Sequence, residues 1–409
     1  MLLAGILLAN VPGNLLGAIR SVWSSYIRKA ALTIILSRAG LSLDVAALRS
    51  LGAATLRLAS IPCAVEASVA AVMTKLLRED ISWGFCFCLG FILAAVSPAV
   101  VIPSLLALQD SGYGGHISTM VLAAASLDDV IAICGLGIAL DIAFSQVEGG
   151  GGQASIIWTA SIAPITIFGG IFVGAGLGYL QYLLTRHTYR HKTIGPIVCS
   201  DIFRAGLLFA TSLVVVYTTS AYDFDAAGYL AVMVAGFVLA RGWDSIDDIS
   251  EQGSPLTFSG TKAVSSNFKL IWTYVMPALF MLIGAQVNLS DITASVLGTA
   301  VAVLVVGLFI RLLVTFGISG YGTDMSSKEK MFIAIAWFPK ATVQAALGSV
   351  VLDRANELSI DDDDVAADVV DIGKFVLTAA VLAIILTAPL GAIGIYITGP
   401  LWLKRTSPD

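Results

Sequence analysis

Long apolar stretches recur along the whole chain, and they limit it to folds that keep most of their surface away from water. Hydrophobic residues make up 57% of the 409 residues and charged residues 12%, whereas a soluble domain carries about 25% charged residues. A helix needs about 17 to 25 residues to cross a bilayer, and by that measure we expect about twelve transmembrane helices. A barrel would show short alternating segments instead, so the sequence predicts an all-α integral membrane protein.

Two adjacent aspartates, Asp128 and Asp129, lie in the middle of one apolar run, MVLAAASLDDVIAICGLGIALDI at 120–142. A carboxylate at the centre of a bilayer helix costs about 2.5 to 3.5 kcal/mol on insertion scales. A cost of that size favours an ion or proton site that faces a protein interior or a wet cavity; a short loop that merely looks apolar is the alternative. Adjacent helical residues point about 100° apart, so we expect one aspartate to line the cavity and the other to face a partner.

Such a carboxylate holds either a proton or a small cation, Na+ or Li+, and this competition is itself a mechanism of exchange. The residues that other classes of protein would need are missing from this sequence. The three histidines lie near polar connections and no two cysteines form a CxxC pair, which excludes a metal-dependent membrane enzyme. Neither a phosphate-binding loop, a GxSxG element nor a basic nucleic-acid footprint occurs. We therefore expect no cofactor and no nucleic-acid partner.

Landmark residues recur at nearly one separation, which indicates an internal repeat. The separations are 244 for Gly40 and Gly284 (284 − 40), 245 for Glu66 and Arg311 (311 − 66), 241 for Pro98 and Pro339 (339 − 98) and 242 for Asp129 and Asp371 (371 − 129). Seven segments, an odd number, separate matched members, so the copies are predicted to lie upside down relative to each other. Inverted-topology repeats are typical of secondary transporters. Chance alignment of apolar runs is the alternative.

Each copy interrupts a long apolar helix with proline. Proline removes a backbone donor and clashes with the preceding turn, so it exposes carbonyls and amides within the membrane. Paired broken helices indicate a transport site, because their ends offer partial charges to ions; a simple kink is the alternative for any one proline. The residues expected at the crossing of the two broken helices are Ser97, Pro98, Pro103, Pro339, Lys340 and Thr342.

Arg311 and Glu66 lie at equivalent depth in the two copies. An arginine does not deprotonate in a protein, so Arg311 serves as a fixed counter-charge and not as a proton carrier. Glu66 is its predicted partner, which leaves the aspartates free to titrate. Separate wet crevices for the two side chains are the alternative.

The connections predict the orientation of the chain. Those expected on one side of the membrane hold more Lys and Arg than those on the other, and they include Lys404 and Arg405. By the positive-inside rule the C-terminus is cytoplasmic, with the acidic run at 361–364 outside. Arg354 is one of the few bases on the outer side, where we expect it in a loop.

Three stretches together resemble the NHA-type sodium/hydrogen exchangers, animal members of the cation/proton antiporter superfamily: AAVSPAVVIPSLLALQ, AAASLDDVIAI and WFPKATVQAALGSVVLD. The resemblance implies an NhaA-like antiporter fold with two crossing broken helices and exchange of Na+ or Li+ for H+ by an elevator-like displacement. It implies that Asp129 is the essential cation and proton carboxylate and Asp128 its neighbour. Arg311 and Glu66 are implied as the counter-charge pair of the animal branch, and Lys340 and Thr342 as part of the second broken helix.

The resemblance also implies a division into domains. A transport core is expected at 51–144 and 292–398, a scaffold that forms a homodimer at 1–50 and 199–291, a linker at 145–198 and a cytoplasmic tail at 399–409. The family has a further helix before the segment that begins at Met1, so we expect the first helix to be missing and the dimer contact to be incomplete. The membrane of residence stays open between the plasma membrane and an organelle membrane, endosomal or mitochondrial inner. Two other functions stay open, a Na+-coupled organic-anion symporter of the same fold and an inactive or regulatory short isoform.

Overall fold

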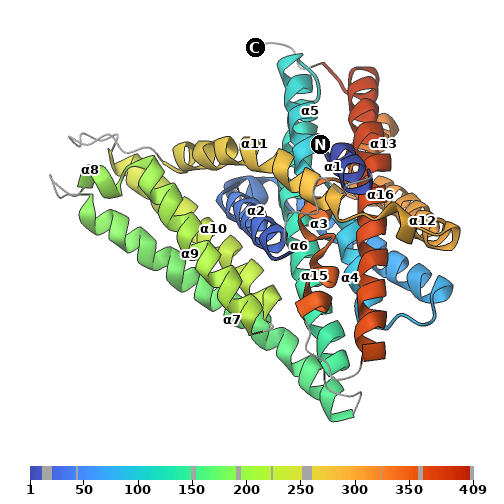
Figure 1. Cartoon of the computed structure of the whole chain (residues 1–409). Coiled ribbons are helices and arrows are strands. Elements are labelled where there is room, and N and C mark those ends of the chain that lie inside the picture. The colour runs from blue at the N-terminus through green and yellow to red at the C-terminus, as the bar shows by residue number, and fades with distance from the viewer. Residues whose placement is uncertain are drawn as a thin grey trace. The chain divides into compact units, whose positions relative to one another are not determined.

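Helices form every regular element among the residues that the computed structural model describes, which are 1–11, 21–42, 45–148, 153–189, 195–222, 224–250, 260–322, 324–357 and 363–405 (Figure 1). The predicted all-helical membrane fold is confirmed. Nine stretches in the described part are long and apolar enough to cross a membrane. The expected count of twelve transmembrane helices is therefore not confirmed. One reason is that the apolar stretch around Pro339 is divided into three helices, each too short to span alone. They are α13 (Ser327–Ala336), α14 (Thr342–Leu347) and α15 (Val350–Glu357). Asp361 and Asp362 of the acidic run and residues 406–409 of the tail lie outside the described residues.

The chain divides into two compact units. The first comprises Met1, Ala18–Leu43 and Gly151–Leu282, and the second Leu2–Gly17, Asp44–Gly150 and Ile283–Asp409. The helices of the first unit are α2 (Ser21–Ser42), α7 (Gln153–Thr188), α8 (Gly195–Val198), α9 (Asp201–Ala221), α10 (Asp225–Ser250) and most of α11 (Thr261–Ala285). In it, α10 packs against α7, α2 and α9.

Small residues bring α7 and α10 into backbone contact. A Cβ on Gly174 would lie 2.3 Å from the carbonyl oxygen of Ala231, and one on Gly178 would lie 2.7 Å from that of Ala235. Gly170 makes the same kind of approach one turn earlier, against Ala227. A glycine face at this spacing packs helices closely in membranes, so these glycines pack two helices of the first unit together.

The second unit contains the same order of helices twice. The first copy is α3 (Val45–Leu77), the divided pair α4 (Trp83–Ala94) and α5 (Pro98–Asp110), and α6 (Gly115–Glu148). The second copy is α12 (Ala294–Ser319), the divided set α13, α14 and α15, and α16 (Asp363–Trp402). The short helices α1 (Leu2–Asn10) and η1 (Leu289–Asp291) complete the unit. Helix α3 packs against α4, α6 and α12, so the copies are joined helix to helix.

The two interruptions are short. In the first copy only residues 95–97 leave the helix, and Pro98 begins α5 at a position where its missing N–H has no helical acceptor to lose. In the second copy residues 337–341 are non-helical and Pro339 lies among them. Pro103, which we expected at the crossing, lies inside α5 instead, because the chain has already resumed a helix at Pro98.

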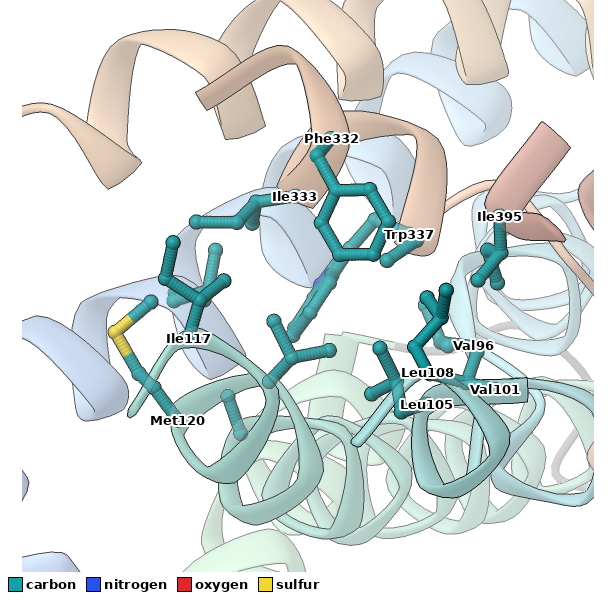
Figure 2. Packing of buried hydrophobic residues seen from close by; sticks show 14 of the residues in the cluster. Val96, Val101, Leu105, Leu108, Ile117, Met120, Phe332, Ile333, Trp337 and Ile395 are labelled. Atoms are coloured by element: carbon teal, nitrogen blue, oxygen red, sulfur yellow. The ribbon is translucent and has the colours of Figure 1, made fainter. Parts of the chain in front are cut away.

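A cluster of buried apolar side chains fills one end of this unit. Figure 2 shows Val96 of the first interruption with Leu105 of α5, near Trp337 of the second interruption and Ile395 of α16. Ile117 and Met120 of α6 extend it on the other side. Between apolar helices in a membrane, such side chains stabilise packing through van der Waals contacts, because the hydrophobic effect does not drive helices together there. The cluster therefore holds the two interruptions at a fixed separation.

The described chain ends against the turn that precedes α6. The Gly114 amide donates to the Lys404 carbonyl over 3.2 Å, and the Arg405 guanidinium lies 5.6 Å from the centre of the Tyr113 ring. Gly114 adopts a φ of 81°, and a Cβ there would meet Leu403 at 2.7 Å, so only glycine fits. The segment 403–405 thus forms a strap over the α5–α6 turn.

Candidate functional site

Asp128 and Asp129 lie midway along α6, and both side chains are buried, at 0% and 4% exposure. As adjacent residues on a helix they face different neighbours. Asp128 accepts two bonds: its Oδ1 lies 2.8 Å from Nη2 of Arg311, and its Oδ2 accepts the Val96 N–H over 2.9 Å. Oδ1 of Asp129 is buried with no hydrogen-bond partner among the described residues. The two carboxylates therefore have unequal surroundings; that one of them lines a cavity stays a prediction.

Arg311 of α12 lies at the centre of a buried charge network. Its Nη1 is 2.5 Å from Oε2 of Glu66 on α3, and the same nitrogen donates to the carbonyl oxygen of Ala94. Its exposure is 0% and that of Glu66 is 1%. The two residues that we expected to pair thus lie in direct contact across the repeat, and the arginine also reaches Asp128.

Lys340 adds a second cation that the sequence did not pair with Glu66. Its Nζ lies 2.9 Å from the Glu66 carboxylate, with 0% exposure, and its backbone N–H donates to the Thr387 hydroxyl over 2.9 Å. One glutamate therefore serves two bases. Buried ions are tolerated when they are paired and bonded in this way.

The two interruptions cross in contact. The Ser97 N–H donates to the Pro339 carbonyl over 2.9 Å, and the Ser97 hydroxyl lies 3.2 Å from that of Thr342. The Thr342 N–H donates to the same serine oxygen over 3.4 Å. Ser97 of one copy thus caps the start of α14 in the other.

Charged side chains of the network bind the two helix ends at the first interruption, and each charge is opposite to the partial charge of the end that it binds. The Val96 amide near the start of α5 meets the Asp128 carboxylate, and the Ala94 carbonyl at the end of α4 meets the Arg311 guanidinium. Anions are stabilised at helix N-termini and cations at C-termini. Gln344 of α14 donates to two more carbonyls at the end of α4, those of Ile92 and Ala95, over 2.7 and 2.9 Å.

Asp371, matched to Asp129 by the repeat, lies elsewhere. Its side chain is 68% exposed and 3.8 Å from Arg78, beyond the end of α3. Arg78 also bonds Asp80 at 2.8 Å, and this hydrogen bond holds the pKa of the Asp80 carboxyl below its usual range. Asp371 is therefore a residue of this exposed charged group and not a buried counterpart of Asp129.

Arg354, expected in a loop, is instead a buried residue of α15. It is paired with Asp141 of α6 at 3.5 Å, with side-chain exposures of 10% and 9%. No feature of the sequence separates it from a loop arginine, since it follows an apolar run and precedes an acidic one. Asp141 carries a weak signal, as a third acid in the apolar run of 120–142.

Known proteins resemble the chain over nearly its whole length. The family model described as "Sodium/hydrogen exchanger, transmembrane" matches residues 1–399. Sodium/hydrogen exchanger 9B2 of Homo sapiens is 37% identical, over 99% of this chain and 69% of that protein. Sodium/hydrogen exchanger 9B1 of Homo sapiens is 37% identical over 99% and 72%, and the 9B2 protein of Xenopus tropicalis 38% over 99% and 69%.

A solved structure shares the fold. The sodium proton antiporter MjNhaP1 from Methanocaldococcus jannaschii superposes with a TM-score of 0.69, covering 98% of this chain and 91% of that one. The sequences are 19% identical, so this likeness bears on the arrangement of the helices alone.

Proposed function

Since the chain belongs to the sodium/hydrogen exchanger family, we propose that it exchanges Na+ or Li+ for H+ across a membrane, with Asp129 holding the cation and the proton in turn. Membership makes the chain a membrane-embedded secondary transporter of monovalent cations and protons, and not an enzyme. The finer steps, namely which residue binds and what moves, are the substance of the proposal.

The unequal surroundings of the two aspartates carry this proposal. Asp128 is held by Arg311 and by a backbone amide, whereas Oδ1 of Asp129 is buried without a hydrogen-bond partner in the part of the chain that the structure describes. A bare buried carboxylate is unfavourable because nothing replaces the water that it has lost. Asp129 is therefore stabilised by a proton or by a cation, and one group that accepts either cargo exchanges them.

The charges beside Asp129 balance without it. The bonded network consists of two acids and two bases, Glu66, Asp128, Arg311 and Lys340. Because Na+, Li+ and H+ each add one positive charge, Asp129 reaches the same net charge with any of them. We therefore propose one-for-one exchange at this residue, which moves no net charge.

We further propose an elevator-like displacement, with residues 51–144 and 292–398 as the moving transport domain. Residues 1–50 and 199–291 would serve as the stationary scaffold and homodimer contact, 145–198 as the linker and 399–409 as a tail. In support, the compact unit that contains Asp44–Gly150 and Ile283–Asp409 supplies every residue of the charge network. The same unit also includes Leu2–Gly17, which the proposal assigns to the scaffold. A binding site built wholly within one body is carried with it.

Flux through reconstituted protein tests the site. We would impose a Na+ or Li+ gradient on proteoliposomes and follow the internal pH with a trapped dye. Asp129→Asn, which keeps the shape of the side chain and removes its charge, is expected to abolish exchange while the protein stays folded. Asp371→Asn is the matched control, since that aspartate is exposed, and it is expected to exchange as the parent does.

The same assay separates the other functions. Cation-driven pH change that persists in Asp129→Asn would reject the site. Sodium-driven uptake of an organic anion without proton movement would identify a symporter. Absence of any flux from correctly inserted parent protein would identify an inactive or regulatory form.

A further inference from the structure

A second ion pair joins the two copies of the repeat at a distance from the aspartates. Arg354 of α15 lies with Nη1 3.5 Å from Oδ1 of Asp141 on α6. The guanidinium also lies 4.6 Å from the centre of the Phe144 ring, one turn further along α6. Arg354 therefore holds one face of α6 at two points, by charge and by a cation–π contact.

The packing around this pair leaves little room for movement. Phe144 is fully buried and meets Phe85 of α4 edge to face at 5.3 Å. A Cβ on Gly84 would lie 2.7 Å from Cα of Ala143, which places α4 and α6 in backbone contact. Close-packed interiors transmit displacement instead of absorbing it.

Helix α15 is held on its other sides too. A Cβ on Gly373 of α16 would lie 2.6 Å from Cα of Leu352, the residue two before Arg354. Asp353 accepts from the Ser349 hydroxyl over 3.0 Å and from the Gln286 amide over 3.4 Å. Both charged residues in the middle of α15 thus bond to their surroundings.

The pair is connected to the aspartates along two helices. Asp141 follows Asp129 by twelve residues on α6, which at 1.5 Å per residue is about 18 Å. Helix α15 follows α14 after two residues, and α14 begins two residues after Lys340. Lys340 bonds Glu66 on α3, a helix packed against α6, so a chain connection joins α15 to a residue that bonds the α3–α6 side.

We propose that Arg354 and Asp141 are positioning residues for cation binding. They fix the second broken helix against the helix that carries Asp129, and so set the geometry of the charge network from a distance. This inference rests on the proposed function of Asp129. A pair that only stabilised the fold would change the melting temperature, whereas a positioning pair also changes the Li+ concentration that half-saturates transport.

The test compares half-saturating Li+ with maximal rate in proteoliposomes of equal protein content. Arg354→Gln is expected to raise the half-saturating Li+ concentration about fivefold or more, which is the size of change typical when a pair in one network is broken. Its maximal rate is expected to stay within about twofold of the parent. Asp141→Asn is expected to do the same, and the double variant no more than either alone. Arg354→Lys, which keeps the charge, is expected to fall between the parent and Arg354→Gln.

Arg57→Gln is the matched control. Arg57 of α3 also makes one hydrogen bond and one ring contact, both to Tyr321, at 2.8 Å and 5.0 Å. It lies in the same unit but does not reach α6 or α15 in these contacts, so its half-saturating Li+ should match the parent.

Three results would overturn the proposal: an unchanged half-saturating Li+ in Arg354→Gln, the same shift in Arg57→Gln, or additive shifts in the double variant. Should Arg354→Gln fail to insert, Arg354→Lys and Asp141→Asn decide between the same outcomes. Exchange retained by Asp129→Asn is a separate result, because it rejects the proposed function whatever the Arg354 variants show.

Discussion

Arg311 bonds Asp128 through its Nη2 at 2.8 Å, although the two residues belong to different copies of the repeat. The arginine bonds Glu66 through its other terminal nitrogen. One guanidinium therefore bonds acids on two helices, α3 and α6, and its planar fork suits this double role better than an ammonium would.

Removal of that arginine should be costly. Arg311→Ala leaves Glu66 and Asp128 buried with Lys340 as the one remaining base of the network, and stranding a buried charge costs about 3 to 5 kcal/mol of unfolding free energy. Lys340 still pairs with Glu66 in that variant, so Asp128 is the acid left without a counter-charge. The double variant with Asp128→Asn removes this stranded charge, so it should melt at a higher temperature than Arg311→Ala alone. Thermal melts of purified protein measure this, and additive losses in the cycle would contradict the pairing.

Ser97 and Thr342 should differ in their contribution to the crossing. Ser97→Ala removes the acceptor of the Thr342 N–H as well as the hydroxyl contact, and an unpaired buried donor costs about 1 to 3 kcal/mol. Thr342→Val removes only the hydroxyl and keeps the shape, so its cost should be about 1 kcal/mol. The melting temperatures of the two variants test this. Equal decreases would show that the hydrogen bond from the Thr342 N–H to Ser97 adds no stability.

Exchange should not respond to voltage. The bonded network holds two acids and two bases apart from Asp129. If one cation replaces one proton at Asp129, as we propose, no net charge crosses the membrane in a cycle. Setting a potassium diffusion potential of either sign across the proteoliposome should leave the rate of Li+-driven pH change unaltered. Acceleration by one sign and slowing by the other would require a second titrating group, for which Lys340 is the first candidate because it is buried beside Glu66.

Two glycines on α7 should respond oppositely to the same change. Gly174→Ala places a methyl group 2.3 Å from the Ala231 carbonyl, whereas a Cβ on Gly176 has nothing within 4 Å. Gly174→Ala should therefore force α7 and α10 apart at a cost of about 1 to 3 kcal/mol. Gly176→Ala should stabilise the helix by about 0.5 to 1 kcal/mol. Thermal melts of both variants are the measurement, and equal shifts would contradict close packing at Gly174.

The sequence predicted the broken helices and the Arg311 and Glu66 contact because both depend on residue types that apolar helices rarely carry. Proline and buried charge are visible in a single chain, and their recurrence showed which residues belong together. Lys340 was placed at the crossing, but its bond to Glu66 depends on how far a flexible side chain reaches. That reach is a property of packing, which residue spacing does not give.

The offset between the copies explains the misplacement of Asp371. The contacts between Glu66 and Arg311 and between Ser97 and Thr342 both span 245 residues. At that separation Asp129 is matched by Lys374 (374 − 129), three residues from Asp371. Three residues turn a helix by about 300°. An offset that is accurate enough to align two helices therefore does not determine which side of the helix a residue faces. Arg354 shows the same limit, since burial of an arginine depends on the neighbouring helix and not on its own segment.

Because the strap at 403–405 contacts the α5–α6 turn, a label attached next to it would report the position of that turn. Leu403, Lys404 and Arg405 are fastened to the turn ahead of α6, within the unit that contains both aspartates. A fluorophore joined just after Arg405 would therefore report on the unit that carries Asp128 and Asp129. Energy transfer between that fluorophore and a lipid dye would measure the proposed displacement without altering a buried residue.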